Sequence, residues 1–173
     1  TDHRQYAPSL EAIAAYENVP IDLIMMPGEE VHPDGNNVHM INFGAQISIN
    51  DYIREHWEEY QKELQEIMRT EKSLEEVSGI GREICASCIW CFRKIRENDG
   101  LGIFCHPFWY IPEGCQDLKE VNEYLSRHMP YDAEEILGGY FKQEMFSNDL
   151  EIAKLQESYR EEKRRGIVGV SDA

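Results

Sequence analysis

Apolar residues recur along the chain with spacings that distinguish strands from helices. Short segments that are nearly all apolar, or that alternate apolar with polar residues, predict strands at residues 21–26, 38–43, 101–105, 133–137 and 167–170. Apolar positions spaced three and four residues apart predict amphipathic helices at residues 10–16, 49–68, 82–97, 117–127 and 148–165. This succession of strands and helices predicts an α/β fold with parallel strands and right-handed crossovers, and it fits a barrel and an open sheet equally.

A β-hairpin is predicted around the dipeptide Asp34-Gly35, because both residues tolerate the positive φ that a tight turn needs. Antiparallel pairing about this turn places Glu30 opposite His39, and His32 lies two residues along on the same face. One carboxylate and two imidazoles side by side suit a divalent transition metal. An exposed polar hairpin face is an equally good interpretation of the spacing.

Polar residues also stand at the ends of predicted strands. His106 follows the strand at 101–105 directly, and Pro107 directs the backbone out of the sheet. The carboxyl ends of strands are where α/β folds place their chemistry, although a histidine there can also simply end the sheet. Asp172 follows the last strand in the same way, and His3 lies in a loop before the first helix.

Three cysteines form a C-x2-C-x2-C pattern, at positions 85, 88 and 91. The spacing is typical of iron–sulfur and zinc sites. On a helix, however, steps of three and four place these thiols among apolar residues such as Phe92 and Ile95. Because buried free cysteine behaves as a small hydrophobe, the sequence predicts a core role for all three.

The composition limits the classes of function. The 173 residues are 42% apolar, which predicts a single domain over residues 1–173, and their net charge of −16 disfavours duplex nucleic acid as a partner. A metal cluster would make the charge locally positive and admit a small anionic substrate.

Five scattered cysteines and the lack of an apolar run of about 18–20 residues predict a soluble cytoplasmic protein that does not bind membranes. Because the chain starts at Thr1 rather than Met, we expect it to be part of a longer protein.

Five short motifs, in this order, resemble those of the PHP family (polymerase and histidinol phosphatase domains). They are TDH at 1–3, PGEEVH at 27–32, NVHMINFG at 37–44, CHPFW at 105–109 and VSDA at 170–173. The resemblance spans the whole chain. It implies a distorted (β/α)7 TIM-like barrel, here incomplete because the family's first strands are absent from these residues.

The resemblance also implies a metal centre. Its expected ligands are His3, Glu30, His39, His106 and Asp172, with Glu30 bridging two ions, and the expected catalytic set is Glu30, His106 and Asp172. The ions would be Zn, Mn or Fe, up to three in a complete domain and one in this chain. Arg4 and His32 stand next to expected ligands and are candidate substrate contacts.

The activity implied is hydrolysis of a phosphate ester by metal-activated water, on a small phosphorylated substrate or a short nucleotide. The family's opening HxH pair and closing His are absent from these residues, so the resemblance predicts little turnover for this chain. Two alternatives remain open: a noncatalytic or regulatory metal-binding PHP module, and a metal hydrolase of amidohydrolase type that acts on amides or esters. The identity of the substrate and the oligomeric state are left undetermined by the sequence.

Overall fold

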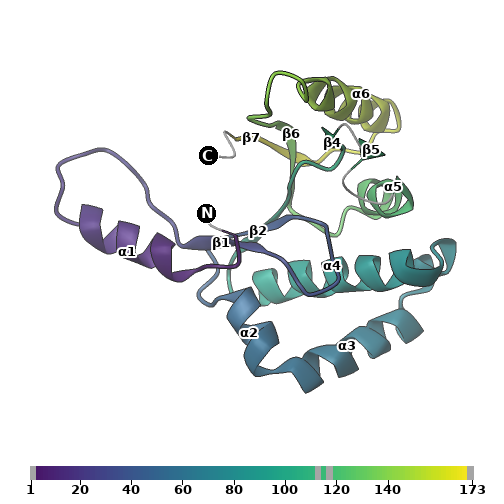
Figure 1. Cartoon of the computed structure of the whole chain (residues 1–173), viewed down its shortest axis with the longest axis horizontal. Coiled ribbons are helices and arrows are strands. Elements are labelled where there is room, and N and C mark those ends of the chain that lie inside the picture. Colours follow the sequence, from purple (N-terminus) through teal and green to yellow (C-terminus); the bar gives the residue numbers. More distant parts are fainter. Residues whose placement is uncertain (1–2, 112–113, 116–118, 171–173) are drawn as a thin grey trace.

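The computed structural model describes residues 3–111, 114–115 and 119–170, and shows an α/β fold with an open, mixed five-stranded sheet (Figure 1). The strands of this sheet are β1 (Gly28–Val31), β2 (Met40–Phe43), β3 (Leu101–Phe104), β6 (Ala133–Leu137) and β7 (Gly166–Gly169). The helices are α1 (Ala7–Tyr16), α2 (Ile49–Glu55), α3 (Trp57–Thr70), the 3-10 turn η1 (Lys72–Glu76), α4 (Gly79–Glu97), α5 (Lys119–His128) and α6 (Phe146–Arg160). A separate two-stranded ribbon is formed by β4 (Tyr110–Ile111) and β5 (Gly114–Cys115).

The strands lie in the order β1-β2-β3-β6-β7. The pairs β1/β2 and β2/β3 are antiparallel, whereas β3/β6 and β6/β7 are parallel. The antiparallel pairing of β1 with β2 agrees with the predicted hairpin, whereas the antiparallel pairing of β2 with β3 differs from the prediction of parallel strands. The loop between β1 and β2 is too short for the crossover that parallel neighbours require, whereas α5 and α6 provide such crossovers before β6 and β7.

The hairpin turn forms at Asp34-Gly35 as predicted, but its register differs. Glu30 pairs with Ile41 instead of His39, which shifts the register by two residues. Gly35 has a φ of +80°, while Asp34 is not among the residues with positive φ, so the turn is not the type I′ turn that continues directly into a ladder. The side chain of Asn36 also holds the loop against α4, donating to Ser87 Oγ at 3.0 Å. A shift of two residues keeps every side chain on its face, so the predicted neighbours still meet.

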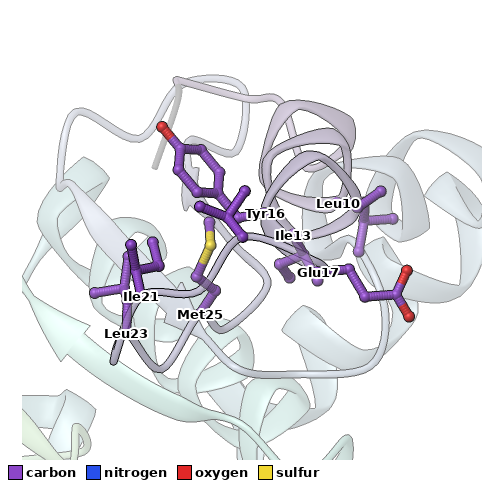
Figure 2. Close-up of a pocket in the computed structure, with 9 residues that line it drawn as sticks. Leu10, Ile13, Tyr16, Glu17, Ile21, Leu23 and Met25 are labelled. Carbon is purple, nitrogen blue, oxygen red and sulfur yellow. The ribbon is translucent and has the colours of Figure 1, made fainter.

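The strand predicted at residues 21–26 is wrong. These residues form an irregular loop that projects with α1 away from the sheet (Figure 1), and the side chains of Leu23 and Ile24 are largely exposed. Figure 2 shows apolar side chains of α1 and this loop around a shared hollow. The apolar run reflects this local contact, since no strand of the described chain pairs with it.

The hydrophobic core lies between one face of the sheet and the helices that follow β2. The helix predicted at 49–68 is divided at His56, where the backbone leaves helical geometry between α2 and α3.

Cys85, Cys88 and Cys91 are fully buried within the hydrophobic core, which confirms their predicted role. Burial raises the pKa of the Cys85 thiol to about 12, so this cysteine is a neutral thiol at physiological pH. No described helix is long and apolar enough to span a membrane.

Strand β1 carries two adjacent glutamates that point to opposite faces of the sheet. Glu29 lies on the core face and anchors the start of α2: it accepts hydrogen bonds from the Ile49 backbone N–H, from Ser48 Oγ at 2.9 Å and from Asn50 Nδ2 at 2.8 Å. A carboxylate at a helix N-terminus satisfies free N–H groups and complements the helix dipole. Glu30 lies on the other face, where the polar site forms.

We expect the Glu29→Ala variant to lose about 3 kcal/mol of unfolding free energy, because several buried donors at the start of α2 lose their acceptor. Urea unfolding at pH 7 measures the change. The matched control is Glu55→Ala, which removes an exposed carboxylate from the other end of the same helix and should change the free energy by no more than about 0.5 kcal/mol. Equal effects of the two substitutions would show that Glu29 is not an anchor.

Candidate metal centre

The side chain of Glu30 lies at the centre of four imidazoles that come from three separate parts of the chain. His32 and His39 belong to the loop between β1 and β2, and His106 follows β3. His3 reaches the site because its backbone forms an isolated parallel bridge with Glu30 at the free edge of β1. The structure therefore brings Glu30 together with these residues as predicted. The most distant of them in sequence, His106, lies 76 positions from Glu30.

One group of possible metal ligands consists of Glu30, His39 and His106. His39 Nδ1 lies 2.7 Å from Glu30 Oε1 and 3.0 Å from His106 Nε2, and the latter nitrogen lies 3.9 Å from Glu30 Oε1. The His39 carbonyl accepts the Cys105 backbone N–H at 3.1 Å. This bond extends the β2/β3 ladder by one step and sets the two imidazoles side by side.

A second group uses the same glutamate with His3 and His32. His3 Nδ1 lies 3.3 Å from Glu30 Oε2 and 3.1 Å from His32 Nε2, which in turn lies 3.1 Å from Glu30 Oε1. Glu30 is buried and His32 is half-buried, whereas the His3 side chain is 69% exposed. The two groups thus share one carboxylate, and the outer one opens to solvent.

These separations fit a shared ion in each group. Bonds of about 2.0–2.2 Å to one cation, at angles near 90–110°, separate neighbouring ligand atoms by about 3.0–3.5 Å. Most of the measured distances lie in or near this range. Imidazole nitrogens with a carboxylate suit Zn, Mn or Fe. The described residues therefore include two His/Glu groups that can hold a metal ion.

Three of these imidazoles also determine the charge of Glu30. Burial by itself would raise the pKa of this carboxyl, but its contacts with His106, His32 and His39 outweigh burial and hold the pKa far below its usual range. Glu30 is therefore an anion at any physiological pH. An ionised carboxylate between two sets of imidazole nitrogens is a favourable arrangement for divalent cations.

The backbone at His106 is unusual: its φ is +33°, in a region that a non-glycine residue rarely adopts. Pro107 follows, and the Trp109 N–H donates to the His106 carbonyl at 3.0 Å, so a tight turn leaves the sheet here. The Trp109 ring lies 5.4 Å from the imidazole of His106, measured between centroids. Strain held at a strand end by surrounding contacts is a common property of functional sites.

The other residues predicted for the site have different outcomes. His32, a candidate substrate contact, lies among the possible metal ligands. Arg4 is exposed and pairs with Asp34 at 3.3 Å, an ion pair that contributes little to stability. Asp172 lies outside the described residues, so its predicted role in the centre stays a prediction.

Sequence reasoning missed the buried acids behind His106. Glu135, on β6, lies with Oε2 3.0 Å from His106 Nδ1, and Glu151, on α6, accepts from the Tyr140 hydroxyl at 2.5 Å. Both carboxylates are fully buried. The sequence signal that could have found Glu135 is a pair of acids inside the apolar strand at 133–137, because a buried strand tolerates a carboxylate only with partners.

The centre opens into a cavity of about 770 Å³ along the face of the sheet opposite the core. His3, Glu30, His106 and Glu135 stand at its polar end. Its apolar wall comes from alternate residues of neighbouring strands, namely Ile41, Phe43, Leu101, Ile103 and Val168. A ligand at the metal centre would therefore have apolar side chains on one side.

Comparison with known proteins does not identify a family: no protein-family model matches the chain, and no curated protein sequence matches it significantly.

The titration of Glu151 yields a prediction about stability. Burial raises the pKa of this carboxyl to about 8, and the Glu135 carboxylate adds to the effect against the hydrogen bond from Tyr140. Above about pH 4.5 the unfolded chain releases this proton while the folded chain keeps it to about pH 8, so the group makes stability fall as pH rises through this window.

Glu151→Gln removes the titration and retains the oxygen that accepts from Tyr140. We expect it to stabilise the fold relative to the unchanged chain by an amount that grows from about zero at pH 4.5 to at most about 4 kcal/mol at pH 8. Urea unfolding at a series of pH values checks this. Asp149→Asn, an exposed neutralisation on the same helix, should show no such trend, and a flat difference for Glu151→Gln would contradict the prediction.

Proposed function

We propose that this chain provides the metal centre of a metal-dependent phosphoesterase of the PHP type. The observation that supports this most strongly is the position of Glu30, whose carboxylate is shared by two His/Glu groups that can each hold a cation. Glu30, His39, His106 and His3 come from the motifs that resemble the PHP family, and these motifs are far apart in the sequence. Sequence resemblance and spatial convergence thus select the same residues independently.

The chain's own residues would prepare the site for a phosphate ester in three ways. Glu30 stays ionised and shares its charge between the two groups, while His39 and His106 direct ring nitrogens at the inner one. Trp109 and Tyr140, with ring centroids 6.1 Å apart, shield His106 from water on one side. Divalent ions held there would supply Lewis acidity towards phosphoryl oxygens and lower the pKa of bound water.

We propose also that the open sheet is part of a distorted (β/α)7 barrel. Two features support this: the ligand-bearing residues follow or end neighbouring strands on one rim, and the cavity face of the sheet carries apolar residues as the interior of a barrel does. The parallel bridge between His3 and Glu30 marks the edge at which a further parallel strand would join β1. Right-handed crossovers through α5 and α6 are the repeating unit of such a barrel.

We expect the chelator-treated chain to bind Mn²⁺ or Zn²⁺, and the ion at 100 times its Kd to raise the unfolding free energy by about 2.7 kcal/mol. Glu30→Gln should remove the binding, because both groups lose their shared anion. Titration calorimetry and thermal melts measure the two effects. The control is His56→Gln, an exposed imidazole outside the centre, which should bind the ions unchanged. Equal binding by the Glu30 variant would exclude this centre.

The activity itself is tested on the native protein, with whatever sequence flanks residues 1–173 in it. Loaded with Mn²⁺, it should hydrolyse members of a panel of phosphate monoesters, phosphate diesters and short oligonucleotides, and Glu30→Gln should abolish the turnover. Metal binding without turnover of any member would favour the noncatalytic module instead. Turnover only of amides or carboxylate esters in the same panel would favour the hydrolase of amidohydrolase type.

A further inference from the structure

The carboxylate of Glu135 meets His106 at two points. Its Oε2 lies 3.0 Å from His106 Nδ1, within ion-pair distance, and the same oxygen accepts the His106 backbone N–H at 3.2 Å. His106 Nε2, on the opposite side of the ring, faces Glu30 and His39. The parallel register of β3 and β6, in which Phe104 pairs with Glu134, brings these strand ends together.

The side chain of Glu135 is held in one position by its surroundings. Its side chain is fully buried, and a Cβ atom added to Gly138 would collide with Glu135 Oε1. Asn148 fixes the backbone at Gly138 from both sides: its Oδ1 accepts the Gly138 N–H at 2.8 Å, and its Nδ2 donates to the Gly138 carbonyl at 3.2 Å. The carboxylate therefore has little room to turn away from the imidazole.

We propose that Glu135 is a positioning residue that fixes the tautomer and orientation of His106, an inference that rests on the metal centre of the proposed function. A neutral imidazole carries its proton on one nitrogen only. An ionised carboxylate can only accept, so it draws the proton to Nδ1 and leaves the Nε2 lone pair directed at the site. Outer carboxylates of this kind orient metal-binding histidines and increase their basicity.

The neighbouring Glu134 provides a matched control. It is equally buried on the same strand, but it points to the opposite face, where it forms an ion pair with Arg165 and accepts from the Tyr131 hydroxyl at 2.8 Å. Glu134→Gln therefore removes a buried carboxylate without changing the contact to His106. A change in metal binding that both variants show would come from lost stability. A change that only Glu135→Gln shows would come from the lost contact between this carboxylate and the His106 imidazole.

The test compares Glu135→Gln with Glu134→Gln and the unchanged chain. Unlike a carboxylate, the Gln side chain can donate to Nδ1 and so allows the tautomer with hydrogen on Nε2, which cannot bind an ion through that nitrogen. We expect Glu135→Gln to weaken Mn²⁺ binding 10–100-fold in calorimetric titration, and Glu134→Gln to leave it unchanged. Nitrogen NMR of labelled histidine at pH 8, without metal, should show hydrogen on Nδ1 of His106 in the unchanged chain and a shift towards Nε2 in Glu135→Gln.

Hydrogen on Nε2 of His106 in the unchanged chain would overturn the inference, and so would equal Mn²⁺ affinity and an identical tautomer in Glu135→Gln. If Glu135→Gln does not fold, Gly138→Ala presses on the same carboxylate, and an unchanged tautomer and affinity in that variant would count against the inference. A chain that binds neither Mn²⁺ nor Zn²⁺ would overturn the proposed function, and the tautomer readout would then decide the role of Glu135 alone.

Discussion

The buried carboxylate of Glu30 is the constraint on which the site depends. A charge that is 4% exposed is tolerated only with compensating partners, and here four imidazoles supply them. Three connections supply these partners: the edge bridge provides His3, the loop between β1 and β2 provides His32 and His39, and the end of β3 provides His106. The cluster consequently ties the free edge of the sheet to its centre, and it brings one carboxylate and several imidazoles together where a cation can be shared.

Strands β1 and β6 each carry two adjacent buried glutamates, and in both strands each glutamate has its own polar partners. In β1, Glu29 anchors α2 from the core face while Glu30 enters the site, and in β6, Glu134 pairs with Arg165 while Glu135 meets His106. Successive strand residues face opposite sides of a sheet, so adjacent acids necessarily separate into two environments. In each pair one carboxylate stabilises the frame and the other lies at the cavity, which links the packing of the core to the geometry of the site.

Pattern reasoning worked best where one local rule controlled the outcome. The apolar stripe of α4 with its three cysteines, the turn at Asp34-Gly35 and the strand ending at His106 all formed as expected. It failed where a segment had to find a partner: residues 21–26 were predicted as a strand but pair with no described strand, and β2 pairs with β3 in the antiparallel direction, not the parallel one. The hairpin lies between these cases, because its register shifted by two residues and the even shift kept Glu30 and His39 on one face.

The sequence by itself determined which side chains can serve a metal centre and, through strand periodicity, that Glu30, His32 and His39 share a face. Strand spacing could not show that His106, 76 positions from Glu30, comes within reach of it, which only the family resemblance implied, and nothing in the sequence placed Glu135 behind that imidazole. Those contacts depend on the order and register of β1, β2, β3 and β6, which are selected by burial of the whole core. Local spacing fixes the face of a residue, because alternation is a property of the backbone, whereas only tertiary packing decides which faces meet.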